Sequence, residues 1–253
     1  MPVRYDEKRP GFNYTHVKYD MSIEEHPLAS QLPQASNRPS VEAGPEHFES
    51  LARRPDAPKK FDDYLYSDEP QLSVHIVSFE DSTLVSLTWP HTYFDAMGRA
   101  TFFNAWTLVL NGQEDKLPPF NGFKTDPLAS LGLSTVEESM LAKYQVKGLS
   151  ILLFTIRYIF EFIWWRKEEN HTVCLPAAYL QSMKQTIMQE LAAQSQGDGG
   201  PFVSDGDVIC AWWTRLALQH LSPTSRRTVV ILNAFGLRGV LSKDLLPAGT
   251  AYT

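Results

Sequence analysis

A histidine that directly follows a strand-like segment is the residue in this sequence best suited to chemistry. Residues 83–88 read TLVSLT, Pro90 and His91 come soon after, and Asp95 and Gly98 follow. Proline has no N–H to donate, so Pro90 ends strand hydrogen bonding and exposes the next side chain at the strand end. An imidazole titrates near neutral pH and can take a proton from a hydroxyl or an amine. His91 is therefore a candidate general base, although a metal ligand or an ordinary turn residue also fits the spacing.

The residues after His91 predict the start of a helix. Asp95 stands where this helix begins, and a carboxylate there can accept hydrogen bonds from the free N–H groups of the first turn. Gly98 has no side chain and lets another element approach that turn closely. Gly112 supplies a stop for the helix. One helix face carries Phe102, Ala105, Trp106 and Val109.

Other catalytic patterns are absent from the sequence. It contains no GxSxG nucleophile elbow, GxGxxG fingerprint, Walker loop or HExxH helix. SDGD at 204–207 is more simply the start of a helix than a metal site. The two cysteines, Cys174 and Cys210, show neither zinc-ribbon spacing nor a disulfide framework. We therefore expect no bound metal. The remaining histidines have no partner at ligand spacing and are interpreted as structural or surface residues: His16, His26, His47, His75, His171 and His220.

Composition limits the class of protein. The 253 residues are 43% hydrophobic and 21% charged, which is enough for one large domain or two small ones. The net charge of −6 argues against nucleic acid, because phosphate binding needs clustered Lys and Arg. The N-terminus is charged and has no apolar run, so it does not read as a signal peptide. We expect a cytoplasmic monomer.

Hydrophobic periodicity predicts a mixture of strands and helices, so the fold class is α/β or α+β. A loop with short helical pieces is expected over 22–61, and a connection over 113–133. The predicted strands are 11–20, the hairpin 72–79 and 83–89, 172–175, and a buried strand at 227–235. The predicted helices begin at Asp95, at about 134, at 177 and after Ser204, and those from 134 and 177 end near 169 and 194.

The longest apolar stretch, residues 149–165, raises the question of a membrane. Its length is near that of a membrane span, but Arg157 and Glu161 lie inside it, and charge at the centre of a bilayer is costly. Four residues apart on a helix, the two can pair. We expect an amphipathic helix on the protein's own core and no membrane contact. The aromatic content and the RKEE that follows leave interfacial binding as the alternative.

Three segments, in order, resemble the BAHD acyltransferases, and in particular their fungal branch. SLTWPHTYFDAMGRATFFNAWTLVLNG (86–112) is similar to the family's HxxxD segment. FVSDGDVICAWWTRLAL (202–218) is similar to the helix that follows the interdomain crossover. ILNAFGLRGVLSKDLLPAGTAY (231–252) is similar to the arginine-containing segment before the Y-x-G-N region. The resemblance covers roughly residues 11–253.

The resemblance implies a chloramphenicol-acetyltransferase-like fold. Residues 1–175 would form part of an N-terminal domain with a long crossover helix, and 176–253 the start of a second domain. It also implies a mechanism in which His91 deprotonates an alcohol or amine acceptor, which attacks the thioester of acyl-CoA without an acyl-enzyme. Acyl-CoA would be a co-substrate, with no tightly bound cofactor. Asp95, Gly98 and Arg238 would be structural.

Some features of the family are missing. Its D-x-R-x-R segment is Gly236-Leu-Arg238-Gly-Val240 here, with one arginine, and the DFGWG motif does not occur. Because family members are about twice as long, the chain is interpreted as an internal fragment or truncated product. Two hypotheses follow: an acyltransferase, or part of one, and a catalytically inactive fragment that binds a small molecule or a protein.

The carboxylate of Asp95 separates two versions of the site. In a triad-like site it would hydrogen-bond the ring of His91 and stabilise its protonated form. We instead expect Asp95 to face away from His91 and pair with Arg238, because a partly buried carboxylate needs a partner and a guanidinium can offer two parallel hydrogen bonds.

Overall fold

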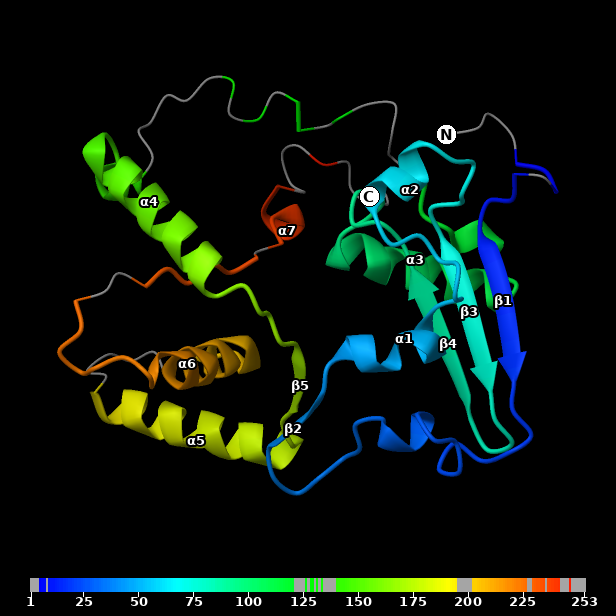
Figure 1. The fold of residues 1–253 in the computed structure, drawn as a ribbon, viewed down its shortest axis with the longest axis horizontal. Helices are drawn as coiled ribbons and strands as arrows, with labels where there is room; N and C mark the ends of the chain where they lie inside the picture. Colours follow the sequence, from blue (N-terminus) through cyan, green and yellow to red (C-terminus); the bar gives the residue numbers. More distant parts are fainter. Residues whose placement is uncertain are drawn as a thin grey trace. The chain divides into compact units, whose positions relative to one another are not determined.

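The computed structural model describes residues 5–7, 9–120, 126, 128–129, 131, 133, 140–194, 202–226, 229–234, 236–241 and 246. It is a mixed α+β structure with two small sheets (Figure 1). Its contacts form two compact units that interleave along the chain. Unit 1 comprises Met1–Tyr19, Ala52–Glu168 and Phe235–Thr253, and unit 2 comprises Asp20–Leu51 and Glu169–Ala234. The division into domains at residue 175 stays a prediction.

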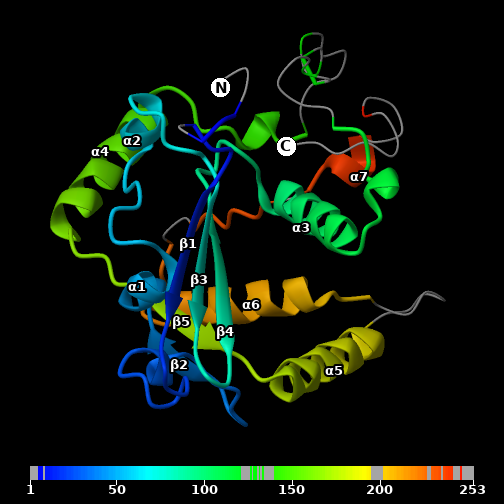
Figure 2. The ribbon, with the colours of Figure 1, turned by 90° about the vertical axis from the view of Figure 1, so that its right-hand side faces the viewer.

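A three-stranded sheet in the order β1-β3-β4 carries unit 1 (Figure 2). β1 (Asn13–Lys18) runs parallel to β3 (Ser73–Ser78), and β3 is antiparallel to β4 (Thr83–Thr88). The hairpin predicted between β3 and β4 is present, and the Phe79 N–H closes it by donating to the Ser82 carbonyl at 2.8 Å. Val74 and Val77 of β3 and Phe79 directly after it are buried, so β3 and its exit supply much of the unit's apolar core.

His75 of β3 shows why a histidine can be structural. It lies between Thr15 of β1 and Ser86 of β4 in the strand register, and only 5% of it is exposed. Its Nδ1 lies 2.6 Å from the Thr15 hydroxyl, and burial lowers the pKa of the imidazole. Because burial favours the neutral ring, His75 serves as an uncharged hydrogen-bonding residue of the sheet.

Unit 1 also contains several helical elements. α3 (Ala96–Leu110) comes directly after the β4 exit, and Gly112 beyond it has a φ of 65°, which glycine adopts without strain. The shorter helical elements are α2 (Phe61–Leu65), η3 (Glu114–Lys116), η4 (Ala142–Tyr144) and α7 (Arg238–Leu241). The helix expected from about residue 134 begins only at Leu149, after Gly148 with a φ of 61°, and residues 134–139 lie outside the described residues.

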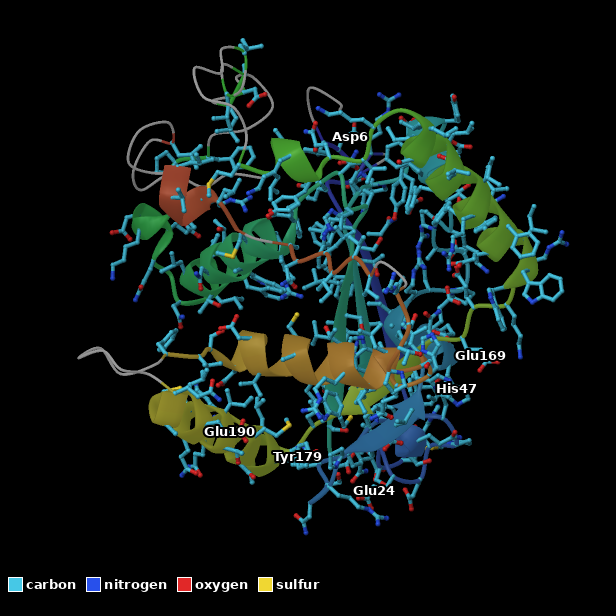
Figure 3. All side chains as sticks on the ribbon, turned by 90° about the vertical axis from the view of Figure 1, so that its left-hand side faces the viewer. Asp6, Glu24, His47, Glu169, Tyr179 and Glu190 are labelled. Carbon is cyan, nitrogen blue, oxygen red and sulfur yellow. The ribbon has the colours of Figure 1, made fainter. Side chains whose placement is uncertain are left out.

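α4 (Leu149–Trp164) forms as the apolar stretch predicted, with Arg157 Nε 3.3 Å from Glu161 Oε1. The expectation that it lies on the protein's own core is wrong. None of its residues is buried by the described part of the chain, and its apolar side chains are exposed. Figure 3 draws side chains along the helix as sticks. Periodicity predicts a helix and its polar stripe, but it does not specify what covers the apolar face. Within the described residues, no helix is both long and apolar enough to cross a membrane.

Unit 2 contains a two-stranded sheet and a helix pair. β2 (Ser40–Ala43) pairs antiparallel with β5 (His171–Cys174). α5 (Ala177–Gln194) contacts α6 (Asp205–Leu218), and Lys184 Nζ lies 2.7 Å from Asp205 Oδ1 across the two helices. Short helical elements precede the sheet or follow β2: η1 (Ala29–Gln31), η2 (Pro45–Phe48) and α1 (Glu49–Ala52), which extends one residue into unit 1.

The structure differs from the sequence-based expectation in two segments, one expected to be a strand and one expected to be a loop. The strand expected at 227–235 is wrong over 229–234, which have no regular structure, and Leu232 is 90% exposed. A β-rich sequence forms a strand only where a neighbour accepts and donates its backbone hydrogen bonds, and no described strand pairs with this segment. The region 22–61, expected as loop with helical pieces, also contains β2, which pairs with β5 about 130 residues away.

Candidate active site

His91 lies in a tight turn at the exit of β4. The Tyr93 N–H donates to the Pro90 carbonyl at 2.8 Å, and this bond closes the turn around His91. The His91 side chain is exposed. The turn therefore ends the strand where the sequence predicted and leaves the imidazole open to a substrate.

An aromatic cluster attaches this turn to α3. The rings of Trp89 and Phe94 pack in a tilted arrangement with centroids 4.6 Å apart, and the Trp89 indole Nε1–H donates to the Phe94 carbonyl at 3.1 Å. Phe94 is only 5% exposed and stacks on Phe102 of α3, with centroids 5.7 Å apart. Because the residues before and after His91 are both held in this cluster, the backbone that carries the histidine is fixed from two sides.

Asp95 is the N-cap of α3. Its backbone is extended, and its Oδ1 accepts hydrogen bonds from the N–H groups of Met97 at 3.1 Å and Gly98 at 2.8 Å. These bonds satisfy two of the N–H groups that a helix start leaves free. The helix therefore begins at the residue that the sequence indicated.

The carboxylate of Asp95 also forms the expected ion pair with Arg238. Arg238 Nη1 donates to Oδ2 at 2.8 Å and Nη2 donates to Oδ1 at 3.0 Å, a two-pronged contact between the start of α7 and the start of α3. The hydrogen bond from Arg238, supported by those from the Gly98 and Met97 N–H groups, lowers the pKa of Asp95 to about 2. Among the described residues, the partners of this carboxylate do not include the ring of His91.

Gly98 occupies the tightest place in the first turn of α3. It is buried, and a Cβ added there would lie 2.7 Å from Cβ of Phe94. Such a contact is closer than side chains tolerate, so a larger residue would push Phe94 away from the turn. The neighbour that needs this space is thus the motif's own Phe94 rather than a separate element.

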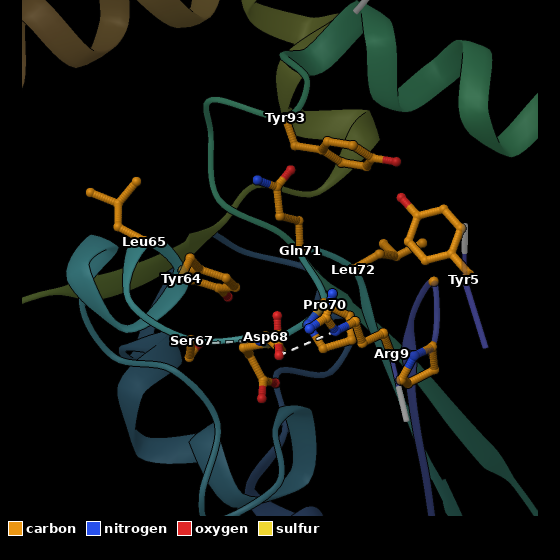
Figure 4. Close-up of a pocket in the computed structure, with 13 residues that line it drawn as sticks. Tyr5, Arg9, Tyr64, Leu65, Ser67, Asp68, Pro70, Gln71, Leu72 and Tyr93 are labelled. Carbon is orange, nitrogen blue, oxygen red and sulfur yellow. Dashed lines mark hydrogen bonds and ion pairs between the residues drawn. The ribbon is translucent and has the colours of Figure 1, made fainter. Parts of the chain in front are cut away.

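A cavity of about 500 Å³ lies next to the same turn in unit 1 (Figure 4). Tyr93, two residues after His91, lines it together with Tyr5 and Tyr64. Burial raises the pKa of Tyr93 and of Tyr64, so both phenols stay protonated and able to donate at neutral pH. The wall also includes Arg9 and Asp68, which form an ion pair at 3.3 Å. The cavity offers three aromatic rings with hydroxyl groups.

Sequence reasoning missed Trp89 and Tyr93. The sequence does show an aromatic residue on each side of His91. An aromatic residue near a strand end is, however, usually interpreted as part of the hydrophobic core. Among the described residues, no group of three or more His, Cys, Asp or Glu side chains is placed to hold a metal ion.

Comparison with characterised proteins gives fungal relatives over the whole chain. The transcriptional regulator calD of Penicillium decumbens is 42% identical over 252 residues, which cover 100% of this chain and 51% of calD. The acetyltransferase adrJ of Penicillium rubens is 38% identical over 255 residues, which cover 100% of this chain and 51% of adrJ. The acetyltransferase sphE of Aspergillus fumigatus is 40% identical over 260 residues, which cover 96% of this chain and 50% of sphE.

The chain therefore spans about half the length of the curated relatives it matches. No family model matches the sequence. No solved structure matches it either, so the chloramphenicol-acetyltransferase-like fold stays a prediction. Along its whole length, the chain is similar to part of a group of fungal proteins that includes named acetyltransferases.

Proposed function

We propose that this chain carries the general base of an acyltransferase, which moves an acyl group from acyl-CoA to an alcohol or amine. The observation that supports the proposal most is the setting of His91. Its ring is exposed in a turn whose flanking residues are fixed, while the nearby Asp95 is engaged by Arg238. Relatives named acetyltransferases, similar over this whole chain, support the same reaction class.

The proposed chemistry is a direct transfer. The neutral imidazole of His91 accepts the proton of the acceptor hydroxyl or amine as its oxygen or nitrogen attacks the thioester carbonyl carbon. The tetrahedral intermediate then collapses, the carbon–sulfur bond breaks, and the coenzyme A thiolate leaves and is protonated. An ester or amide and free coenzyme A are the products. In this scheme no acyl group is ever attached to the protein.

Asp95 has a positioning role in this proposal. A carboxylate that accepts hydrogen bonds from Arg238 and two backbone N–H groups has little capacity left for an imidazole. Its contribution is to fix the start of α3 and thereby the turn that carries His91. This is the opposite of a triad, in which the carboxylate stabilises the protonated histidine.

The cavity that Tyr93 lines is the proposed place of the part of the acceptor away from its reacting group, because His91 is not among the lining residues. Aromatic faces suit a ring-bearing or apolar molecule, and the protonated phenols can donate hydrogen bonds to its oxygen atoms. Because Arg9 and Asp68 neutralise each other, the wall formed by this pair favours a neutral acceptor over a strongly charged one.

A thiol-release assay tests the proposal. The purified chain is incubated with acetyl-CoA and a panel of neutral alcohols and amines, free thiol is measured, and the acylated product is identified by its mass. Acceptor-dependent thiol release together with an acetylated acceptor is the expected result. No release above the protein-free rate with any acceptor would contradict the proposal for this chain.

The name of calD, a transcriptional regulator, raises a second activity. The net charge of −6 disfavours direct DNA binding, because affinity for DNA comes largely from neutralised phosphates. An inactive fragment that binds a small molecule or a protein is the other alternative. Acceptor binding without any thiol release would favour that fragment, and salt-sensitive DNA binding at micromolar protein would favour the regulator.

A further inference from the structure

α4 presents a broad apolar surface that the described residues do not cover. Leu152, Ile156, Ile159 and Ile163 recur at helical spacing, and each is at least half exposed. A second row beside it contains Leu149, Leu153, Phe160 and Trp164, and the rings of Phe160 and Trp164 stack at 5.8 Å. Exposed contiguous apolar surface of this kind marks a binding face.

Three polar residues of α4, including both of its charged residues, form a narrow stripe on the other side. Ser150, Arg157 and Glu161 are seven and four residues apart, so they lie along one line of the helix. The Arg157–Glu161 pair at 3.3 Å neutralises the only charges within the helix. Most of the helix circumference is therefore apolar, which is wider than the seam that two packed helices share.

The charges next to α4 differ in sign from those of the chain as a whole. Lys143 and Lys147 precede the helix, and Arg166 and Lys167 follow it. Residues 143–169 contain five basic and three acidic residues, a net charge of +2 in a chain whose net charge is −6. Basic residues at both ends of an apolar helix are complementary to anionic lipid headgroups.

The C-terminal end of α4 adds aromatic side chains at the same place. Trp164 and Trp165 are 68% and 74% exposed, and Arg166 and Lys167 follow directly. Tryptophan prefers the boundary between headgroups and acyl chains, because its ring is apolar and its N–H is polar. A surface meant for another protein would be expected to have fewer basic residues around its rim and to keep its apolar residues on one side.

We propose that α4 binds a lipid bilayer with anionic headgroups and lies in the plane of its interface. The 16 residues of α4 span about 24 Å, at 1.5 Å per residue, less than the roughly 30 Å of a bilayer's hydrocarbon core. The apolar rows enter the acyl boundary, the stripe of Arg157 and Glu161 faces water, and the flanking basic residues contact headgroups. The protein would then meet an apolar acceptor where such molecules concentrate.

Vesicle flotation with the full chain tests this proposal. Two kinds of vesicle are used: pure phosphatidylcholine, and phosphatidylcholine with about 30% phosphatidylserine, whose surface potential attracts basic segments. The protein is expected to float with the anionic vesicles, and more weakly with the neutral ones. A protein that stays at the bottom of the gradient with both would overturn the proposal.

Two variants locate the binding surface. Ile156→Glu with Ile163→Glu puts charge into an exposed apolar row and is expected to lower the partition coefficient at least about tenfold, since inserted charge is costly. Val230→Glu with Leu232→Glu is the matched control, because these residues are also exposed and lie outside α4. Equal flotation of both variants and the unchanged protein would overturn the assignment to α4.

Two further outcomes decide the class of partner. Replacing Lys143, Lys147, Arg166 and Lys167 with Gln is expected to abolish the preference for anionic vesicles and leave the weak binding to neutral ones. If the chain instead forms a concentration-dependent dimer that Ile156→Glu with Ile163→Glu dissolves, and no vesicle binds, α4 is an interface between two copies. Thiol release measured without vesicles is expected to be the same in the apolar-row variant, which separates this proposal from the proposed activity.

Discussion

The β4–α3 junction and α4 are both rich in aromatic residues, but they differ in whether their side chains have partners within the described part of the chain. At the junction, Phe94 is buried, Asp95 caps the helix and binds Arg238, and Gly98 leaves room for the close contact. In α4, one ion pair is formed and the apolar side chains stay exposed. The contrast indicates that the junction is built to hold one geometry, while α4 is built to meet a surface from outside.

The largest effect is expected at the histidine that the junction carries. His91→Ala should lower acceptor-dependent thiol release by about 10²- to 10⁴-fold, because a positioned general base contributes about that much to the rate. The fold should be unchanged, since the side chain is exposed. The rate is measured by thiol release and the fold by circular dichroism. His220→Ala, an exposed histidine in unit 2, is the control and should keep full activity, while near-normal turnover in His91→Ala would remove His91 from the mechanism.

The tight contact at Gly98 is the next place where the junction should respond. Gly98→Ala is expected to destabilise the chain by about 1–2 kcal/mol. The clash with Phe94 costs about 1–3 kcal/mol, and helix propensity returns at most about 1 kcal/mol. Urea unfolding measures the change. Gly239→Ala in α7 is the matched control, because an added Cβ would meet no atom within 4 Å. Equal stabilities of the two variants would show that the approach of Phe94 is not tight.

The Asp95–Arg238 pair should contribute less than a buried pair. The two side chains are 46% and 29% exposed, so solvent screens the pair, and Asp95→Ala is expected to cost about 1–2 kcal/mol, including the lost cap. A fully buried pair would cost about 3–5 kcal/mol. Adding Arg238→Met to Asp95→Ala should recover part of the loss in a urea titration. A strictly additive double variant would show that the two residues are not coupled.

Acidification provides a check on the same pair. The folded pKa of Asp95 is about 2, below the ordinary value of 3.8, because Arg238 and the cap bonds favour the carboxylate. A lowered folded pKa means that the contribution to stability is complete above about pH 4 and is lost as the pH falls toward 2. The stability difference between the unchanged chain and Asp95→Asn should therefore shrink over this window. A difference that stays constant to pH 2 would argue against the pair.

The smallest effect on stability is expected in α4. Ile156→Glu should change the free energy of unfolding by no more than about 0.5 kcal/mol, because the side chain is already 56% exposed and loses no packing. Val77→Ala in β3, where only 1% of the residue is exposed, should instead cost about 1 kcal/mol or more. If Ile156→Glu proved as destabilising as Val77→Ala in urea, α4 would be covered in solution and the contrast with the junction would fail.

The features that sequence reasoning predicted well are set by neighbours in the chain. The hairpin of β3 and β4, the cap of α3 at Asp95 and the start of α6 after Ser204 each depend on residues a few positions apart. The parallel pairing of β1 with β3 and the pairing of β2 with β5 join segments about 60 and 130 residues apart. Short-range periodicity contains no information on such partners.

Part of the candidate site could be predicted from the sequence for the same reason. Pro90, His91 and Asp95 form a local pattern, and the pairing of Asp95 with Arg238 followed from charge and from the family resemblance. Two features could not be predicted from the sequence. Arg238 begins α7, a helix that was not among the predicted ones, and the surface of α4 was expected to be covered. Both depend on contacts between distant segments, which apolar content alone does not specify.

The pH dependence of thiol release in Asp95→Asn tests whether His91 acts as a base without help from Asp95. The acidic limb of the rate profile reports the protonation of the catalytic base. Because Asp95 is paired with Arg238, its midpoint should be the same in the unchanged chain and in Asp95→Asn, even where the maximal rate falls. A midpoint lower by about one pH unit in Asp95→Asn would mean that the carboxylate stabilises protonated His91 and would contradict the account, as would a chain that releases no thiol at any pH.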